Sequence, residues 1–389
     1  MSEFAYSIVN SLEDAQQLGK IIEQCFVEPG ESEPYLNRIG RENHRIIRQG
    51  QQIVGGLAII QMGQWWGGQS VPMAGIASVG IAPEYRGSHA ALTLMQHTVK
   101  ELYDCGVPIS VLFAATQHLY RKAGYEQAGT ACGWKISTGD IQIKEKPLAI
   151  ASVKCDQEIL QKMYNQQATL NNGNLDRSTT IWKYWTDPDD KQPLYTYIFG
   201  TVDKPQGYII FSQEKAGDDS FLLVKDWVVL TLDAAKTFWA FLANHRTQME
   251  EIHWKGSSCD ILTLLLPEQN FETRFVERWL LRVINVPKAL LLRGYPQGTT
   301  AELHLEVEDD LITENNGKFI LTVANGRGEV TKGGKGELKI DVRSLAPLYT
   351  GLFTPRQLQL AGKIQATATS LAAATQIFAG TSPWMPDFF

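Results

Sequence analysis

Residues 78–95 read SVGIAPEYRGSHAALTLM, and this stretch decides how the first third of the chain is expected to fold. An apolar strand ends at a proline, an Arg-Gly turn follows, and small residues lead into an amphipathic helix. The start of a helix carries free N–H groups and the positive end of the helix dipole, so it can hold a phosphate. An ordinary strand-turn-helix connection has the same pattern, and the turn by itself leaves both interpretations open.

Length, charge and hydropathy limit the possible classes of protein. A chain of 389 residues exceeds one ordinary core and predicts two or three domains. A formal net charge of -6, without Lys/Arg-rich runs, argues against a nucleic-acid partner. The N-terminal residues are too polar for a secretory signal, and no apolar run approaches the roughly 20 residues of a membrane span. We therefore expect a cytoplasmic protein without a membrane segment.

The cysteines are odd in number, widely spaced and without a CxxC pair, which predicts reduced thiols. They are Cys25, Cys105, Cys132, Cys155 and Cys259. Because no His/Cys cluster has the spacing of metal ligands, we expect no metal site.

Hydrophobic periodicity predicts three domains, at residues 1–148, 149–285 and 286–389. The first alternates helices and strands and has a strand-helix-strand crossover, and Gly55 and Gly56 predict a bulge. The second repeats the order of helix, strands, helix and strand, which indicates a divergent internal duplication. The third has strands joined by Asn/Gly turns beside short helices. The expected fold class is α/β in the first two domains and α+β in the third.

Three local expectations concern the later part of the chain. Residues 233–254 are predicted to form one helix capped by Asp233, and residues 261–267 a buried strand. The chain ends in TSPWMPDFF, whereas chain ends are usually polar and frayed. We therefore expect the last residues to be buried.

The turn resembles the acyl-coenzyme A motif of the GNAT N-acetyltransferase superfamily, Arg/Gln-x-x-Gly-x-Gly/Ala. Here the motif reads RGSHAA over residues 86–91, and His89 replaces the middle glycine. The His89 side chain either donates a hydrogen bond to a phosphate or faces solvent. The resemblance implies that acetyl-coenzyme A (acetyl-CoA) contacts the strand, the turn, the helix start and the end of the next strand. These residues are Val79, Gly80, Ile81, Arg86, Gly87, Ser88, His89, Ala90, Ala91, Leu92, Ala115 and Thr116.

Residues 120–125, YRKAGY, are similar to the superfamily's tyrosine followed by a glycine turn. The resemblance implies that the Tyr120 hydroxyl points at the thioester sulfur and acts as a general acid toward the leaving thiolate. The spacing alone also fits a core aromatic residue on an amphipathic helix. Tyr125 is the competing tyrosine, and we expect it to pack under the sheet.

Residues 277–295, ERWLLRVINVPKALLLRGY, resemble the beginning of the sterol-carrier-protein-like domain of the Eis (enhanced intracellular survival) acetyltransferases. With the GNAT motif and the motif-free second domain, this resemblance spans nearly the whole chain. It implies tandem GNAT folds followed by a sterol-carrier-protein-like domain, and a homo-oligomer, often a hexamer in the family. It also implies that the α-carboxylate of Phe389 reaches the first domain and serves as general base.

The implied reaction moves an acetyl group from acetyl-CoA to a primary amine of a cationic small molecule, such as an aminoglycoside, or to a lysine-like amine. Glu28, Glu31, Glu33, Trp65 and Trp66 would suit a polycation through ion pairs and cation–π contacts. A solvated loop and two packed tryptophans explain the same residues. Two alternatives stay open: a non-catalytic acyl or lipid carrier that uses the third domain, and a transferase for a longer acyl chain or a protein amine.

Overall fold

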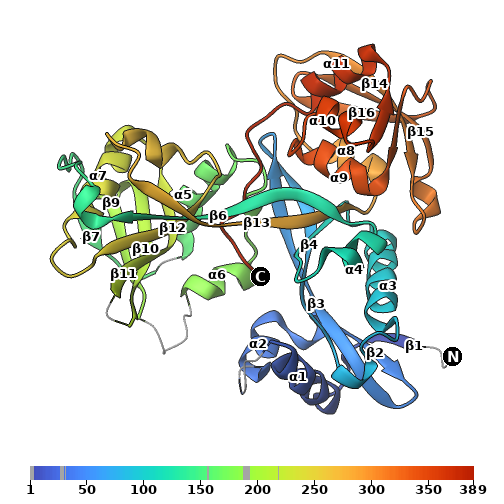
Figure 1. The fold of residues 1–389 in the computed structure, drawn as a ribbon, viewed down its shortest axis with the longest axis horizontal. Helices are drawn as coiled ribbons and strands as arrows, with labels where there is room; N and C mark the ends of the chain where they lie inside the picture. The colour runs from blue at the N-terminus through green and yellow to red at the C-terminus, as the bar shows by residue number, and fades with distance from the viewer. Residues whose placement is uncertain (1–3, 27–29, 31, 156, 187–192, 218) are drawn as a thin grey trace. The chain divides into compact units, whose positions relative to one another are not determined.

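The computed structural model describes residues 4–389 except 27–29, 31, 156, 187–192 and 218 (Figure 1). Contacts divide the chain into two compact units. The first unit contains Met1–Ala128, Trp279–Thr381 and Phe389, and the second contains Gly129–Arg278 and Ser382–Phe388. Neither unit is therefore one continuous segment of the chain.

The N-terminal part of the first unit is built on a sheet with the order β1-β2-β3-β4-β5. These strands are β1 (Phe4–Ile8), β2 (His44–Gln49), β3 (Gln52–Trp66), β4 (Gln69–Ile81) and β5 (Ile109–Phe113). The pairs are antiparallel except β4–β5, which is parallel because α3 (Ala90–Asp104) connects the two strands. The last residues of β13 (Phe271–Val283) pair antiparallel with β5.

Helices cover both faces of this sheet, since successive side chains of a strand point to opposite faces. Ile46 packs in an apolar cluster with α1 (Leu12–Phe26) and α2 (Ser32–Ile39), whereas Ile47 packs in a second cluster with α3. In Figure 1, α1 and α2 lie on one side of the long strands and α3 lies on the other. Helix α4 (Gln117–Lys122) follows β5 and contributes Tyr120 to the α3 cluster.

Strand β4 separates from β5 and, further along the chain, bulges against β3. Gly56 pairs with Gly80 but Ala58 pairs with Ala77, so β4 holds one residue more than β3 over this interval. Ser78 takes the left-handed φ of 51° there. The bulge expected at Gly55 and Gly56 is misplaced: both glycines pair regularly, and the extra residue in β3 is the neighbouring Val54, where the register against β2 shifts. The β4–β5 pairing is confined to Met73–Gly75 against Ile109–Val111, so the rest of β4 diverges from β5.

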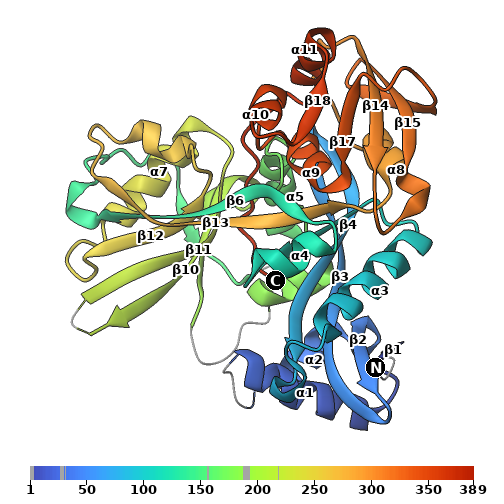
Figure 2. The same cartoon turned by 45° about the vertical axis from the view of Figure 1, so that its right-hand side comes forward.

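The C-terminal part of the first unit is an α+β structure with the strand order β16-β15-β14-β17-β18 (Figure 2). The strands are β14 (Ala301–Glu308), β15 (Gly317–Ala324), β16 (Arg327–Lys332), β17 (Leu338–Asp341) and β18 (Ile364–Ala366). The helices are α8 (Val286–Leu292), α9 (Val342–Thr350), α10 (Pro355–Leu360) and α11 (Ala368–Ile377). Helix α8 packs against β16, and α11 packs against β14. This arrangement agrees with the α+β fold predicted for the C-terminal part of the chain.

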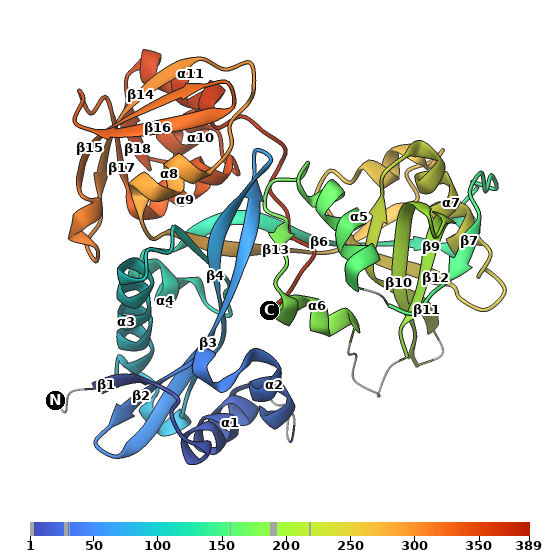
Figure 3. The same ribbon diagram turned by 180° about the vertical axis from the view of Figure 1, so that it is seen from behind.

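The second unit contains a sheet with the order β6-β12-β11-β10-β9-β7 (Figure 3). Its strands are β6 (Glu126–Ser137), β7 (Ile150–Ser152), β9 (Tyr195–Thr201), β10 (Lys204–Ala216), β11 (Asp219–Val229) and β12 (Glu251–Gly256). The remaining elements are β8 (Leu175–Asp176), α5 (Gln157–Ala168), α6 (Thr179–Thr186) and α7 (Leu232–Ala243). Phe238 and Trp239 of α7 belong to the largely aromatic core of this unit.

Two predicted elements in the second unit are wrong. The helix expected at 233–254 ends at Ala243, because turns follow and Glu251–Gly256 joins the sheet as β12. Its N-cap is Thr231, whose hydroxyl accepts a hydrogen bond from Ala234 N at 3.1 Å. The strand expected at 261–267 is instead a 3₁₀ helix, Ile261–Leu265, started by the Asp260 side chain.

The chain end is held within the second unit, and the expected burial is confirmed for most of it. Trp384 and Met385 are buried, and their backbone N–H groups donate to Asn172 and Thr130. The buried Asp387 lies 2.9 Å from Arg177, whose guanidinium also pairs with Asp226. Burial shifts the pKa of Asp387 upward. Phe388 is exposed, whereas Phe389 belongs to the first unit.

Candidate active site

The turn after β4 leads directly into α3 with two left-handed residues. Gly87 has a φ of 81°, and a Cβ built there would meet nothing within 4 Å. His89 has a φ of 69° and is the N-cap of α3, although its side chain makes no capping bond. The histidine therefore adopts a backbone conformation that glycine takes without strain. This explains how the turn keeps its path although a motif glycine is replaced.

A cavity of about 370 Å³ lies between this turn and α4. It is lined by Ile81, Tyr85, Arg86, Gly87, His89, Ala90, Ala91, Leu92, Thr116, His118, Leu119 and Lys122. Most of the predicted coenzyme residues are therefore brought together at one cavity. Val79, Gly80, Ser88 and Ala115 do not line it, and His118 and Lys122 line it although the motif did not predict them.

This cavity fits a phosphorylated ligand. The first N–H groups of α3, from Ala90 onward, have no partner within the helix, because no helical carbonyl precedes them by four residues. The helix dipole is also positive at this end. Arg86 adds a cation whose Nη2 lies 3.7 Å from the Cys25 sulfur. Residues 76–81 of β4 do not pair with β5 among the described residues, and Ile81 at the end of this part lines the cavity.

Tyr120 and Tyr125 lie in different environments. Tyr120 is 6% exposed, and burial raises the pKa of its phenol to about 12. Among the described residues its hydroxyl has no hydrogen-bond partner. Tyr125 is completely buried, and its hydroxyl lies 2.8 Å from the Ser110 hydroxyl, which donates to Ala74 O. Tyr125 therefore packs in the core, whereas Tyr120 belongs to the α3 cluster and does not line the cavity at the turn.

Gly124 is required for an ion pair that sequence reasoning missed. It has a φ of 87°, and a Cβ at this position would overlap the Arg282 guanidinium. Arg282 is fully buried, and its Nη2 donates to both carboxylate oxygens of Asp309 at 2.9 Å. The glycine after Tyr120 thus admits an arginine of β13. The sequence RWLLR does not indicate which turn its second arginine packs against, so this contact was not predictable.

Phe389 packs where the pairing of β4 and β5 ends. A Cβ on Gly75 would come within 2.5 Å of the Phe389 ring, so the glycine makes room for the terminal residue. The ring also lies edge-on to Phe113, with centroids 6.1 Å apart. Because Gly75 pairs with Val111 in the last β4–β5 pair, the terminal residue borders the start of the divergence.

The predicted amine-binding residues have separate environments. Trp66 is fully buried and packs edge-on against Trp279 and Tyr349, so it offers no exposed surface to a ligand. Trp65 is half-buried, and its buried indole N–H has no hydrogen-bond partner among the residues that the structure describes. Glu28 and Glu31 lie outside the described residues.

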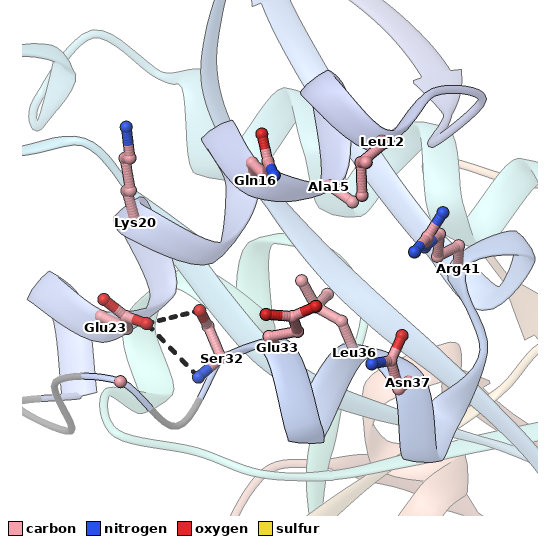
Figure 4. Close-up of a pocket in the computed structure, with 11 residues that line it drawn as sticks. Leu12, Ala15, Gln16, Lys20, Glu23, Ser32, Glu33, Leu36, Asn37 and Arg41 are labelled. Atoms are coloured by element: carbon pink, nitrogen blue, oxygen red, sulfur yellow. Dashed lines mark hydrogen bonds between the residues drawn. The ribbon is translucent and has the colours of Figure 1, made fainter.

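Glu33 lines a cavity of about 470 Å³ between α1 and α2 (Figure 4). Figure 4 shows Glu23 accepting hydrogen bonds from the Ser32 hydroxyl and backbone N–H. Lys20 and Arg41 line the same cavity, so its charges are mixed. This charge balance does not by itself select a cation.

The described part of the chain contains no group of three or more His, Cys, Asp or Glu side chains placed to hold a metal ion. Within the same residues, the five cysteines form no disulfide. None of the described helices combines the length and hydropathy needed to cross a membrane.

The split sheet and the turn at the start of α3 are the architecture of an acetyltransferase domain, and comparisons with known proteins agree. Models of the acetyltransferase (GNAT) domain match residues 10–128 and 173–283, and a sterol carrier protein domain matches residues 286–386. A solved GCN5-related N-acetyltransferase from Anabaena variabilis is 58% identical, with a TM-score of 0.97 and complete coverage of both chains.

Two other relatives are more distant. A protein named as an uncharacterized N-acetyltransferase of Streptomyces griseus is 26% identical over 352 residues, 83% of each chain. The N-acetyltransferase Eis of Mycobacterium tuberculosis is 23% identical over 366 residues, 89% of each chain. This chain belongs to the GCN5-related N-acetyltransferase family, as an Eis-like member with two GNAT domains and a sterol-carrier-protein-like domain. It is an N-acetyltransferase, and GNAT enzymes in general use acetyl-CoA.

Proposed function

We propose that this enzyme acetylates a primary amine of a cationic small molecule or a lysine-like amine, with Tyr120 as general acid and the Phe389 α-carboxylate as general base. The observation that carries the proposal is the packing of Phe389 on Gly75, where β4 and β5 stop pairing. A carboxylate at that point is close to the strand that leads into the Arg-Gly turn. The proposal keeps the three domains at residues 1–148, 149–285 and 286–389.

The residues around α3 would hold the coenzyme. Arg86 and the first N–H groups of α3 suit its diphosphate, and the edge of β4 at Val79–Ile81, which β5 does not reach among the described residues, suits its pantetheine amides. When bound, acetyl-CoA supplies an acetyl thioester whose carbon–sulfur bond breaks as the amine nitrogen bonds to the acetyl carbon.

Tyr120 supplies the proton that the sulfur takes up. Burial raises the pKa of Tyr120 to about 12, so its hydroxyl stays protonated at neutral pH and can donate a hydrogen bond to the sulfur. Complete transfer to the free thiolate is uphill, because a thiol is a stronger acid than this phenol, so the hydroxyl acts mainly by a hydrogen bond to the charge that develops on the sulfur. Any phenolate formed regains its proton from water. Removing the hydroxyl should therefore lower kcat and leave coenzyme affinity intact.

The Phe389 carboxylate takes the proton that the amine loses, either directly or through one water. Proton transfer needs a heavy-atom separation of about 2.6–3.2 Å, or one bridging water. The Phe389 ring fixes the last residue against Gly75 and Phe113, which restricts where its carboxylate can lie. One proton leaves the amine and one reaches the sulfur, so the reaction balances.

The test measures free thiol released from acetyl-CoA by the full chain, with an aminoglycoside and with a polyamine as acceptors. The expected result is acceptor-dependent thiol release, together with a thermal shift caused by coenzyme A alone. Absence of thiol release with both acceptors, combined with absence of a thermal shift, would contradict the proposal.

A second candidate function is acyl or lipid carriage, and one cavity favours it. A cavity of about 270 Å³ is lined by Pro347, Phe353 and Leu358 of the sterol-carrier-protein-like part and by Arg121. Saturable binding of a fatty acid without thiol release from acetyl-CoA would support carriage. Thiol release would leave transfer as the function.

A further inference from the structure

The cavity at the Arg-Gly turn has two basic walls. Arg86 and His89 belong to the turn, and His118 and Lys122 project from α4 on the other side. His118 and Lys122 are four residues apart on a helix, which places them on one face. Both side chains are exposed at the cavity, although the motif that predicted the turn does not include them.

The cavity contains basic residues without acidic ones. None of the described residues that line it is an aspartate or a glutamate, although the whole chain has a net charge of -6. Lys122 also borders a recess that holds Asp309, Asp310 and Asp341. Within the described chain, however, no carboxylate lies within 4.0 Å of the Lys122 ammonium or the His118 ring. Both groups are therefore available to an external anion.

The two walls offer two sets of anion-binding groups. Arg86 and the helix N–H groups form one anion site, whereas α4 offers separate donors from its side chains. A ligand with two separate anionic groups can engage both sets. Coenzyme A has this chemistry, because it carries a diphosphate and a separate 3′-phosphate on its ribose.

We propose that His118 and Lys122 bind the 3′-phosphate of coenzyme A while the turn binds its diphosphate. This inference rests on the proposed function and deepens it, because it makes α4 the element that distinguishes coenzyme A from dephospho-coenzyme A. The two ligands differ only in that phosphate. Lys122 acts as a point charge, and His118 donates a ring N–H.

The experiment is calorimetric titration of the full chain with coenzyme A and with dephospho-coenzyme A. The variants are Lys122→Met and His118→Gln, and Lys100→Met is the control, because Lys100 is exposed on α3 and does not line the cavity. We expect the native chain to prefer coenzyme A by about 10-fold or more, which corresponds to about 1.4 kcal/mol. Lys122→Met should remove most of that preference, and Lys100→Met should keep it.

The double comparison separates a phosphate contact from a general loss of structure. A contact to the 3′-phosphate weakens only coenzyme A, whereas damage to α4 weakens both ligands. In turnover, Lys122→Met should raise the KM for acetyl-CoA with kcat unchanged.

Equal affinities of the native chain for the two ligands would overturn the inference and leave the proposed function intact. Equal weakening of both ligands by Lys122→Met and His118→Gln, or no effect of either variant, would also overturn it. If the native chain bound neither ligand and released no thiol, the proposed function itself would fail.

Discussion

Gly124 shows how one residue constrains the neighbourhood of the proposed acid. Replacement by alanine puts a Cβ into the Arg282 guanidinium at a φ of 87°. The arginine must move, which strains or breaks its buried pair with Asp309. We expect Gly124→Ala to lower the free energy of unfolding by about 3 kcal/mol or more, measured by urea unfolding.

Gly362→Ala is the matched control, since Gly362 also has a left-handed φ, of 69°, and a Cβ there meets nothing within 4 Å. It should lower the free energy of unfolding by only about 1 kcal/mol, the cost of the left-handed backbone. Equal free energies of unfolding for the two variants would show that the close approach of Arg282 to Gly124 does not affect stability.

His89 makes a prediction about strain in the turn. Its φ of 69° suits glycine, so His89→Gly should stabilise the chain by about 0.5–1 kcal/mol in urea unfolding. His89→Ala keeps a Cβ in the same conformation and should give no gain. If the glycine variant were no more stable than the alanine variant, the turn would not be strained by its side chain.

Tyr120 makes a prediction about pH. Because burial raises the pKa of its phenol to about 12, Tyr120 should stay protonated at every pH below about 11. The difference in ultraviolet titration between the native chain and Tyr120→Phe should show one phenol ionising above that pH. An ionisation near pH 10, the ordinary value, would contradict the buried environment.

Individual residues were predictable where a short motif fixes a backbone path. Arg86, Gly87 and Ala90 lie together at one cavity because the chain between β4 and α3 is short. Gly124 was matched to a motif, but its reason was not predictable, since Arg282 comes from a strand far along the chain. Trp66 was uncertain for the same reason: its packing partners, Trp279 and Tyr349, are remote in sequence.

At the scale of elements, the start of α7 separates two candidate caps. The Thr231 hydroxyl accepts from Ala234 N, whereas Asp233 lies inside the first turn. We expect Thr231→Ala to lower the free energy of unfolding by about 1 kcal/mol. Asp233→Ala removes only a favourable charge at the helix dipole, about 0.3–1 kcal/mol, in the same assay. A larger loss for Asp233→Ala would reverse this assignment.

Elements were predicted well where the apolar spacing was unambiguous, as for α3 and for the strands of the third domain. Residues 233–254 failed because the apolar residues of β12 continue the helical spacing of α7 across a polar turn. Residues 261–267 failed because a short apolar run fits several structures, and here Ile261 and Leu264 are exposed. Tertiary pairing decides such cases.

At the scale of the whole molecule, the chain order and the compact units differ. The sequence suggests three consecutive domains, yet the first compact unit combines Met1–Ala128, Trp279–Thr381 and Phe389. This grouping arises because the end of β13 pairs with β5 and the last residue packs on β4. Local periodicity carries no information about contacts between segments far apart in the sequence. The apolar chain end, in contrast, did indicate that the last residues pack against the rest of the protein.

The chain end is also where the proposed mechanism is most exposed to test. One glycine added after Phe389 keeps every side chain but moves the α-carboxylate by one residue. Phe389→Ala instead keeps the terminal carboxylate and removes the ring that packs on Gly75. Comparing the two separates the chemistry of the carboxylate from its positioning.

The decisive measurement is kcat for thiol release by the glycine-extended chain relative to the native chain, with coenzyme A affinity measured in parallel. Loss of a general base typically lowers the rate by about 10²–10⁴-fold. We predict a fall of at least about 10²-fold with unchanged affinity, and a smaller fall for Phe389→Ala. An extended chain that turned over at the native rate would contradict the assignment of the terminal carboxylate as the base.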